Sequence, residues 1–255
     1  MVLAVQEFFP RSHIVYFADP LHFPYGEKTK EELLPIVQPV FDFLVNGVGV
    51  EVLLVACGTV SSLILPELRR RYPVPLVGIV EPACKEALRL IPEGVIGVLA
   101  TRATIGVGAF RQMLTELRPG VEVLEEAWPD FIEAVERGNF DTPFWRTWTR
   151  ARLETFYEKG VRGLIMGCTH FALISSFFEE MASGLFPIVN PASSCAQEAR
   201  NLLGEEEGGE GGSLTVLVRG DKDAFADTIR RFHLPLNGEI HSFCDVHGWV
   251  AHVRE

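Results

Sequence analysis

The stretch Gly163-Leu164-Ile165-Met166-Gly167-Cys168-Thr169-His170 places a cysteine directly after a short apolar run. Residues 171–178 follow with the apolar spacing of a helix, so we expect Cys168 at a turn from a strand into a helix. Backbone N–H groups at the start of a helix carry partial positive charge, which favours a thiolate over a thiol. The pattern therefore predicts a cysteine of lowered pKa at the carboxyl end of a buried strand.

A second stretch repeats this arrangement nearer the start of the chain. Val52-Leu53-Leu54-Val55-Ala56-Cys57-Gly58-Thr59 is also an apolar run that ends in a cysteine, and residues 61–70 follow it as a predicted helix. Two cysteines in equivalent settings indicate two similar halves of the molecule that face each other.

Predicted strands and helices alternate along the whole sequence. The predicted strands cover residues 13–19, 52–56, 75–80, 95–100, 121–124, 163–167, 185–189, 213–218 and the surroundings of Ile240. Alternation favours an α/β fold of parallel sheets covered on both faces. We expect two similar parallel-sheet α/β domains, one formed by residues 1–82 plus 190–255 on the Cys57 side and one by residues 83–189 on the Cys168 side. Ligands of such sheets bind beyond the carboxyl ends of the strands, so the cleft between the domains is the expected active site.

Composition excludes several classes of protein. A net charge of −11 argues against a surface for nucleic-acid phosphates, which needs clustered lysine and arginine. Neither a run long enough to cross a membrane nor a signal-peptide pattern is present. The five cysteines are scattered without a CxxC pair, which disfavours a metal site or redox dithiol and favours reduced thiols in a cytoplasm.

Two thiols that face each other across a cleft suit one reaction above others. One thiol can remove a proton from a carbon while the other returns a proton to the opposite face, which is racemisation without a cofactor. Hydroxyls and amides near the cysteines would stabilise the carbanion, and threonines stand near predicted strand ends at positions 59, 101, 104 and 169. His170 is placed to tune Cys168 or relay its proton. We interpret Cys84, Cys195 and Cys244 as buried or incidental.

Several motifs, taken in order, resemble those of glutamate racemase in the aspartate/glutamate racemase superfamily. They are His13–Asp19, Pro24-Tyr25-Gly26-Glu27-Lys28, Val55–Thr59, Val77–Pro82, Ile96–Ile105, Met166–Phe171 and the helix of residues 221–232. The resemblance covers nearly all of the chain. It implies two α/β domains and interconversion of L- and D-glutamate without pyridoxal phosphate or metal, which supplies D-glutamate for peptidoglycan in a bacterial cytoplasm. It also implies glutamate as the partner molecule and a homodimer as one expected assembly.

The resemblance assigns roles to individual residues. Cys168 would take the proton from L-glutamate and Cys57 the proton from D-glutamate. Glu136 matches a carboxylate near the site, and His170 matches the histidine beside the second cysteine. The implied substrate-binding residues are Pro24, Tyr25, Gly26, Gly58, Thr59, Thr101, Thr104 and Thr169.

Three departures from the family pattern leave alternatives open. One is the stretch Ile188-Val189-Asn190-Pro191-Ala192, which stands where the family tends to have Ile-Asp-Ser-Gly-Ala. Family members begin with a strand ending in Asp-Ser-Gly, whereas this sequence begins within the helix expected after it. Gly58 replaces the asparagine of an Ala-Cys-Asn-Thr pattern, which removes a polar side chain and is expected to enlarge the pocket near Cys57. One alternative is therefore a related racemase acting on aspartate, a hydantoin or a maleate-type substrate. The other is a racemase-like protein of impaired catalysis with a binding or regulatory role.

Overall fold

The computed structural model describes residues 1–204, 211–234, 236 and 238–243. Its strands are β1 (His13–Ala18), β2 (Leu53–Val55), β3 (Leu76–Gly78), β4 (Val95–Ala100), β5 (Val123–Ala127), β6 (Val161–Met166), β7 (Ile188–Val189), β8 (Ser213–Val218) and β9 (Glu239–Ser242). All of their pairings are parallel, which confirms the predicted α/β class.

Helices separate these strands as the sequence predicted. They are α1 (Val2–Phe8), α2 (Lys30–Asp42), α3 (Gly58–Leu63), α4 (Leu65–Leu68), α5 (Val80–Leu90), α6 (Arg102–Val107), α7 (Ala109–Leu117), α8 (Pro129–Glu136), α9 (Pro143–Glu158), α10 (Thr169–Leu173), α11 (Ser175–Met181), α12 (Pro191–Leu203) and α13 (Lys222–Arg231). Short 3-10 turns cover Pro20–His22 and Tyr25–Glu27, and a π-helical turn covers Phe43–Val48. A capping box begins α2, because Thr29 and Glu32 bond to each other's backbone N–H.

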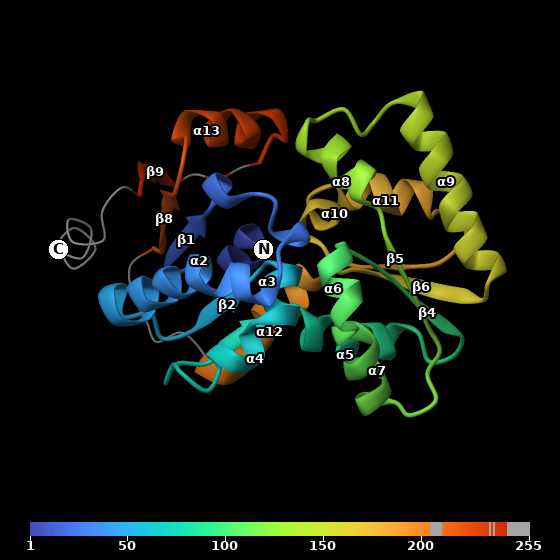
Figure 1. Cartoon of the computed structure of the whole chain (residues 1–255), viewed down its shortest axis with the longest axis horizontal. Helices are drawn as coiled ribbons and strands as arrows, with labels where there is room; N and C mark the ends of the chain where they lie inside the picture. The colour runs from blue at the N-terminus through green and yellow to red at the C-terminus, as the bar shows by residue number, and fades with distance from the viewer. Residues whose placement is uncertain (205–210, 235, 237, 244–255) are drawn as a thin grey trace.

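The strands form separate sheets on the two sides of the molecule (Figure 1). On the Cys168 side a four-stranded sheet has the order β5-β4-β6-β7. On the Cys57 side the described strands form a three-stranded sheet, β1-β8-β9, and a two-stranded sheet, β2-β3. Each cysteine follows a strand of its own side, so both lie at carboxyl ends of parallel strands, where the sequence placed them.

The domain boundaries stay a prediction. In the structure, each predicted boundary falls in or next to a helix of the same packed pair. The change of domain expected between residues 82 and 83 falls within α5, which packs against both α7 and α12. The change expected between residues 189 and 190 falls between β7 and α12. Both boundaries thus meet at the packed pair of α5 and α12.

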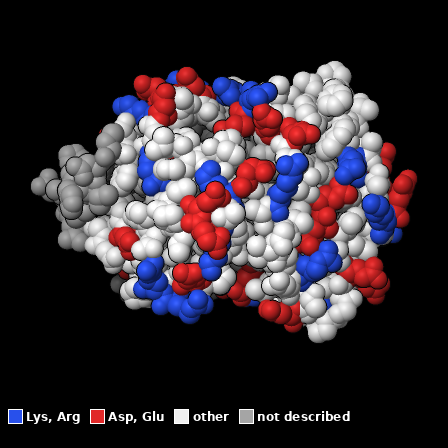
Figure 2. All heavy atoms as spheres, viewed as in Figure 1, with Lys and Arg blue, Asp and Glu red and all other residues white. Residues whose placement is uncertain are grey.

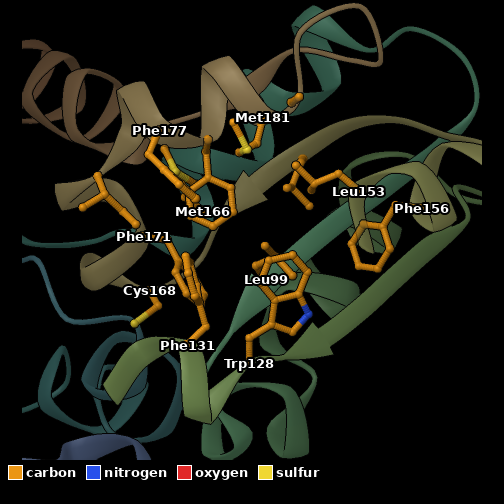
Figure 3. Close-up of a cluster of buried hydrophobic side chains, with 14 of the residues drawn as sticks. Leu99, Trp128, Phe131, Leu153, Phe156, Met166, Cys168, Phe171, Phe177 and Met181 are labelled. Carbon is orange, nitrogen blue, oxygen red and sulfur yellow. The ribbon is translucent and has the colours of Figure 1, made fainter. Parts of the chain in front are cut away.

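The Cys168 side has an aromatic core. Its fully buried rings come from α8, α9, α10 and α11, namely Phe131, Phe156, Phe171 and Phe178. Trp145 and Trp148 pack against this cluster, as expected for a helix that covers a core. Figure 3 shows Cys168 at the margin of the cluster, with its sulfur pointing away from the rings. The core therefore supports the strand-to-helix turn that carries this cysteine.

Within the described ranges, no helix combines the length and apolar character that crossing a bilayer requires. Figure 2 shows basic and acidic side chains interspersed on the face in view, without a basic patch. Cys84 and Cys195 are buried, as expected, whereas Cys244 and residues 205–210 lie outside the described residues.

Candidate active site

The two cysteine turns have the same local structure. Cys57 follows β2 and is the N-cap of α3, and Cys168 follows β6 and is the N-cap of α10. Each of these short helices stops at an isoleucine, Ile64 or Ile174, and a second helix begins at the next residue. The repeat that the sequence predicted is therefore present. It includes the break in the helix that follows each cysteine.

The two turns touch each other. A Cβ atom built on Gly58 would lie 2.1 Å from the carbonyl oxygen of Gly167, so a larger residue at position 58 would collide with backbone. The expectation that Gly58 enlarges the pocket near Cys57 is wrong, because the Gly167 backbone fills the space that a side chain would take. Gly58 instead allows the turns that carry Cys57 and Cys168 to approach closely.

Cys168 belongs to a hydrogen-bonded chain of three side chains. Its Sγ lies 3.6 Å from Nδ1 of His170, whose Nε2 lies 2.9 Å from Oε2 of Glu136 at the end of α8. Burial opposes a charge on the imidazole, but hydrogen bonds to Cys168 and Glu136 outweigh burial and raise the pKa of His170 to about 10. The hydrogen bond from His170 also holds the pKa of Glu136 below its ordinary value. His170 thus carries a proton next to the Cys168 sulfur at neutral pH.

Cys57 has a different environment. Burial raises the pKa of its thiol above the ordinary value, although the backbone N–H groups of Val60 and Thr59 and the Thr59 hydroxyl bond to the sulfur and act in the opposite direction. A thiolate on Cys168 would raise the pKa of Cys57 further by repulsion. The predicted lowering of the pKa by a helix end is therefore wrong for Cys57, because desolvation outweighs the helix amides.

Three of the predicted threonines form one chain of hydroxyls. The Thr59 Oγ1 lies 3.1 Å from the Thr101 Oγ1, which lies 3.0 Å from the Thr104 Oγ1. Thr101 is the N-cap of α6, and Thr59 and Thr104 are almost fully buried. Thr169, the first residue of α10, is exposed. The structure thus brings Thr59, Thr101 and Thr104 together, whereas it leaves Thr169 on the surface of the second turn.

The loop of Pro24, Tyr25 and Gly26 reaches from β1 to the other side. A Cβ atom built on Gly26 would lie 2.7 Å from the Thr101 Cγ2, so the loop backbone packs directly on Thr101. The neighbouring Phe23 ring lies 5.5 Å from the His170 ring. The predicted loop residues, the threonine chain and the cysteine turns therefore gather in one region between the two sides of the molecule.

Comparisons with known proteins show the family of this chain. Residues 1–199 match the family model described as Asp/Glu/Hydantoin racemase. The chain belongs to this racemase family. Among curated relatives, the glutamate racemase of Desulforudis audaxviator is 33% identical over 242 residues, which are 91% of this chain and 88% of that protein. The glutamate racemase of Aquifex aeolicus is 34% identical over 206 residues, 81% of this chain and 79% of that protein.

Solved structures of the racemase family have the same fold. A glutamate racemase isoform from Bacillus anthracis superposes with a TM-score of 0.86 at 25% identity and covers 96% of this chain and 91% of its own. The Thermus thermophilus glutamate racemase in complex with beta-chloro-D-alanine gives 0.81 at 28% identity, over 95% of this chain and 91% of its own. Both matches therefore extend over nearly the whole chain.

Beside the candidate site lie two charged residues to which the sequence analysis assigned no role. Asp19 and Arg219 form an ion pair beside the Tyr25 loop, and their numbers differ by 200. The sequence would point to this ion pair only if β1 and β8 were already known to be neighbours. Ala18 and Val218 pair at the ends of these strands, and Asp19 and Arg219 are the residues that follow them. Pairing of distant strands is decided by tertiary structure rather than by a local pattern.

Proposed function

We propose that this chain is a cofactor-independent racemase that interconverts L- and D-glutamate by proton transfer between Cys57 and Cys168. Its biological role would be to supply D-glutamate for peptidoglycan, from the cytoplasm. The observation that carries the proposal is the contact of two matching strand–cysteine–helix turns at Gly58 and Gly167. This arrangement supports one thiol on each face of a substrate carbon.

The two thiols would share the work in each direction. Cys168 would remove the α-proton of L-glutamate while Cys57 donates a proton to the opposite face, and the roles would reverse for D-glutamate. His170, held by Glu136, would return a proton to Cys168 or accept one from it between turnovers. The raised pKa of Cys57 suits a thiol that begins the L-to-D reaction as a proton donor.

Hydroxyls and amides around the thiols would bind the substrate carboxylates. The chain of Thr59, Thr101 and Thr104 and the Pro24-Tyr25-Gly26 loop lie closest to the cysteine turns. Thr169 would take part through its position beside Cys168, where its exposure leaves the hydroxyl accessible to a ligand. Donors aimed at the carboxylate stabilise the carbanion that forms when the proton leaves.

Proton exchange in deuterated water tests the proposal. Purified protein is incubated with L-glutamate without added cofactor, and the α-proton NMR signal is followed together with optical rotation. Loss of the signal with loss of rotation is the expected result. Absence of both, in folded protein, would overturn the proposal, and the same assay on aspartate and hydantoins would then identify the substrate. A homodimer stays a prediction, which sedimentation velocity tests.

A further inference from the structure

Asp19 and Arg219 form a buried ion pair at the edge of the candidate site. The Arg219 Nε donates to the Asp19 Oδ1 at 3.0 Å, and the second guanidinium nitrogen donates to Oδ2, so the pair is bidentate. The Asp19 side chain is 8% exposed and the Arg219 side chain 16%. Bidentate pairs of this kind fix the orientation of both partners, and losing either one leaves a buried charge without a partner.

Arg219 is itself held by its surroundings. Its guanidinium also donates to the carbonyl oxygen of Ile36 in α2, at 3.1 Å, and its Cζ lies 5.7 Å from the centre of the Phe17 ring. The backbone continues the β1–β8 pairing here, because the Arg219 N–H donates to the Ala18 oxygen at 2.9 Å. Arg219 therefore presents its guanidinium to Asp19 from a fixed position at the end of β8.

Asp19 in turn holds the substrate loop. The Tyr25 hydroxyl donates to the Asp19 carboxylate, and Nδ1 of His22 lies 3.0 Å from both carboxylate oxygens. Burial opposes the charge on Asp19, but hydrogen bonds from Arg219, Tyr25 and His22 outweigh burial and hold its pKa below the ordinary value. Asp19 is therefore ionised at neutral pH and accepts bonds from both ends of the segment 22–25.

The opposite face of this loop contacts the Cys168 side. The Phe23 ring lies beside the ring of His170, and Gly26 packs on Thr101. Glu27 adds an exposed ion pair with Arg102 at 3.9 Å. The loop thus has a charged anchor on one side of the site and lies against the proton-relay histidine and the threonine chain on the other.

We propose that Arg219 is a positioning residue for the reaction, which acts through Asp19 and Tyr25 to hold the loop of residues 20–28 over the substrate. This inference rests on the proposed racemase function. Arg219 touches neither thiol directly, so its effect is on how well the loop is placed for substrate binding. We expect this effect on substrate binding rather than on proton transfer, because the loop supplies substrate contacts and no reacting sulfur.

Kinetics of Arg219→Gln, Tyr25→Phe and the double variant test the inference. Each single change is expected to raise KM for glutamate about tenfold, with kcat changed less than about threefold. The double variant is expected to match the worse single variant rather than multiply the two effects, since both changes break the same chain of contacts. Arg230→Gln is the matched control, because Arg230 pairs with Asp227 on the exposed face of the neighbouring helix α13, and its KM should stay unchanged.

The variant Asp19→Asn/Arg219→Gln controls for loss of stability in Arg219→Gln, because it removes both buried charges together and leaves neither without a partner. It should melt like the wild type and still show the raised KM. The inference would be overturned if the effects of Arg219→Gln and Tyr25→Phe on KM multiplied when the two changes are combined. A fall in kcat at unchanged KM would also overturn it.

Hydrogen exchange of residues 20–28 separates this inference from the proposed function. Exchange in this loop should accelerate in Arg219→Gln and in Tyr25→Phe and stay unchanged in Arg230→Gln, whether or not the protein racemises glutamate. Faster exchange in a protein without glutamate racemase activity would support the anchor and refute the proposed substrate. Unchanged exchange in Arg219→Gln would refute the anchor even in an active racemase.

Discussion

At the scale of single residues, the sulfur atoms of Cys57 and Cys168 carry the proposed proton transfers. A serine hydroxyl in the same place is a far weaker base, so Cys57→Ser and Cys168→Ser should each lower the racemisation rate by about 10²- to 10⁴-fold. Polarimetry with D- and L-glutamate measures this loss, and circular dichroism shows that the fold is retained.

A buried cysteine outside the site provides the control for these variants. Cys195 is fully buried in α12, where burial raises the pKa of its thiol to about 12, and it takes no part in the proposed reaction. The Cys195→Ala variant should keep its activity. Wild-type activity in either Cys57→Ser or Cys168→Ser would contradict the two-thiol mechanism.

Gly58 is the residue whose role the structure changed most. Its contact with the Gly167 oxygen leaves no room for a Cβ atom, so Gly58→Ala must push the two cysteine turns apart. A misplacement of about 1 Å at a reacting centre costs about 10²-fold in rate, and we expect kcat/KM to fall by that order.

The matched control for this change is Gly106→Ala. Gly106 lies in α6, and a Cβ atom there meets no atom within 4 Å, so activity should be retained. A Gly58→Ala or Gly58→Asn variant as active as the wild type would show that the turns need not approach so closely.

At the scale of elements, the bond between His170 and Glu136 joins α10 to α8. The pKa of His170 in the folded protein, about 10, exceeds its ordinary value of 6.5, so the protonated form stabilises the fold. This stabilisation is complete below about pH 6.5 and is lost as the pH rises towards 10. Urea unfolding of the wild type and of His170→Asn should therefore differ more at pH 6 than at about pH 10. An equal difference at both values would contradict the charged pair.

The elements themselves were largely predictable from the sequence. Short apolar runs in the sequence predicted every strand of the four-stranded sheet. The breaks at Ile64 and Ile174 were missed, because the apolar pattern continues across them. Local patterns specify which segments form a helix, and contacts with the rest of the protein decide where the backbone departs from it.

At the scale of the whole molecule, the candidate site draws residues from both sides. A bound glutamate would contact both cysteine turns and the loop between them, so it should stabilise the folded protein as a unit. At about 100 times the dissociation constant, such a ligand adds about 2.7 kcal/mol to the free energy of unfolding. For a chain of this size that amounts to a rise in melting temperature of about 5–10 °C.

Differential scanning fluorimetry with L-glutamate, D-glutamate and glycine measures this effect. Both glutamate enantiomers should raise the melting temperature, whereas glycine, which lacks the side-chain carboxylate, should leave it unchanged at equal ionic strength. An equal rise with all three amino acids would indicate a general solvent effect rather than a site for glutamate.

Local sequence patterns predicted the α/β class, the two cysteine turns and the approximate positions of the candidate site residues. These follow from hydrophobic periodicity and from small residues at strand ends, which act over a few neighbouring positions. The resemblance to the racemase family added roles that the pattern alone leaves open.

The interactions between these parts became visible only in the folded molecule. It placed Gly58 against Gly167, joined Asp19 to Arg219 across the β1–β8 pairing and raised the pKa of Cys57 through burial. The physical reason is the same in each case. Desolvation and close contact depend on atoms that are distant in sequence, and those atoms meet only when the chain has folded.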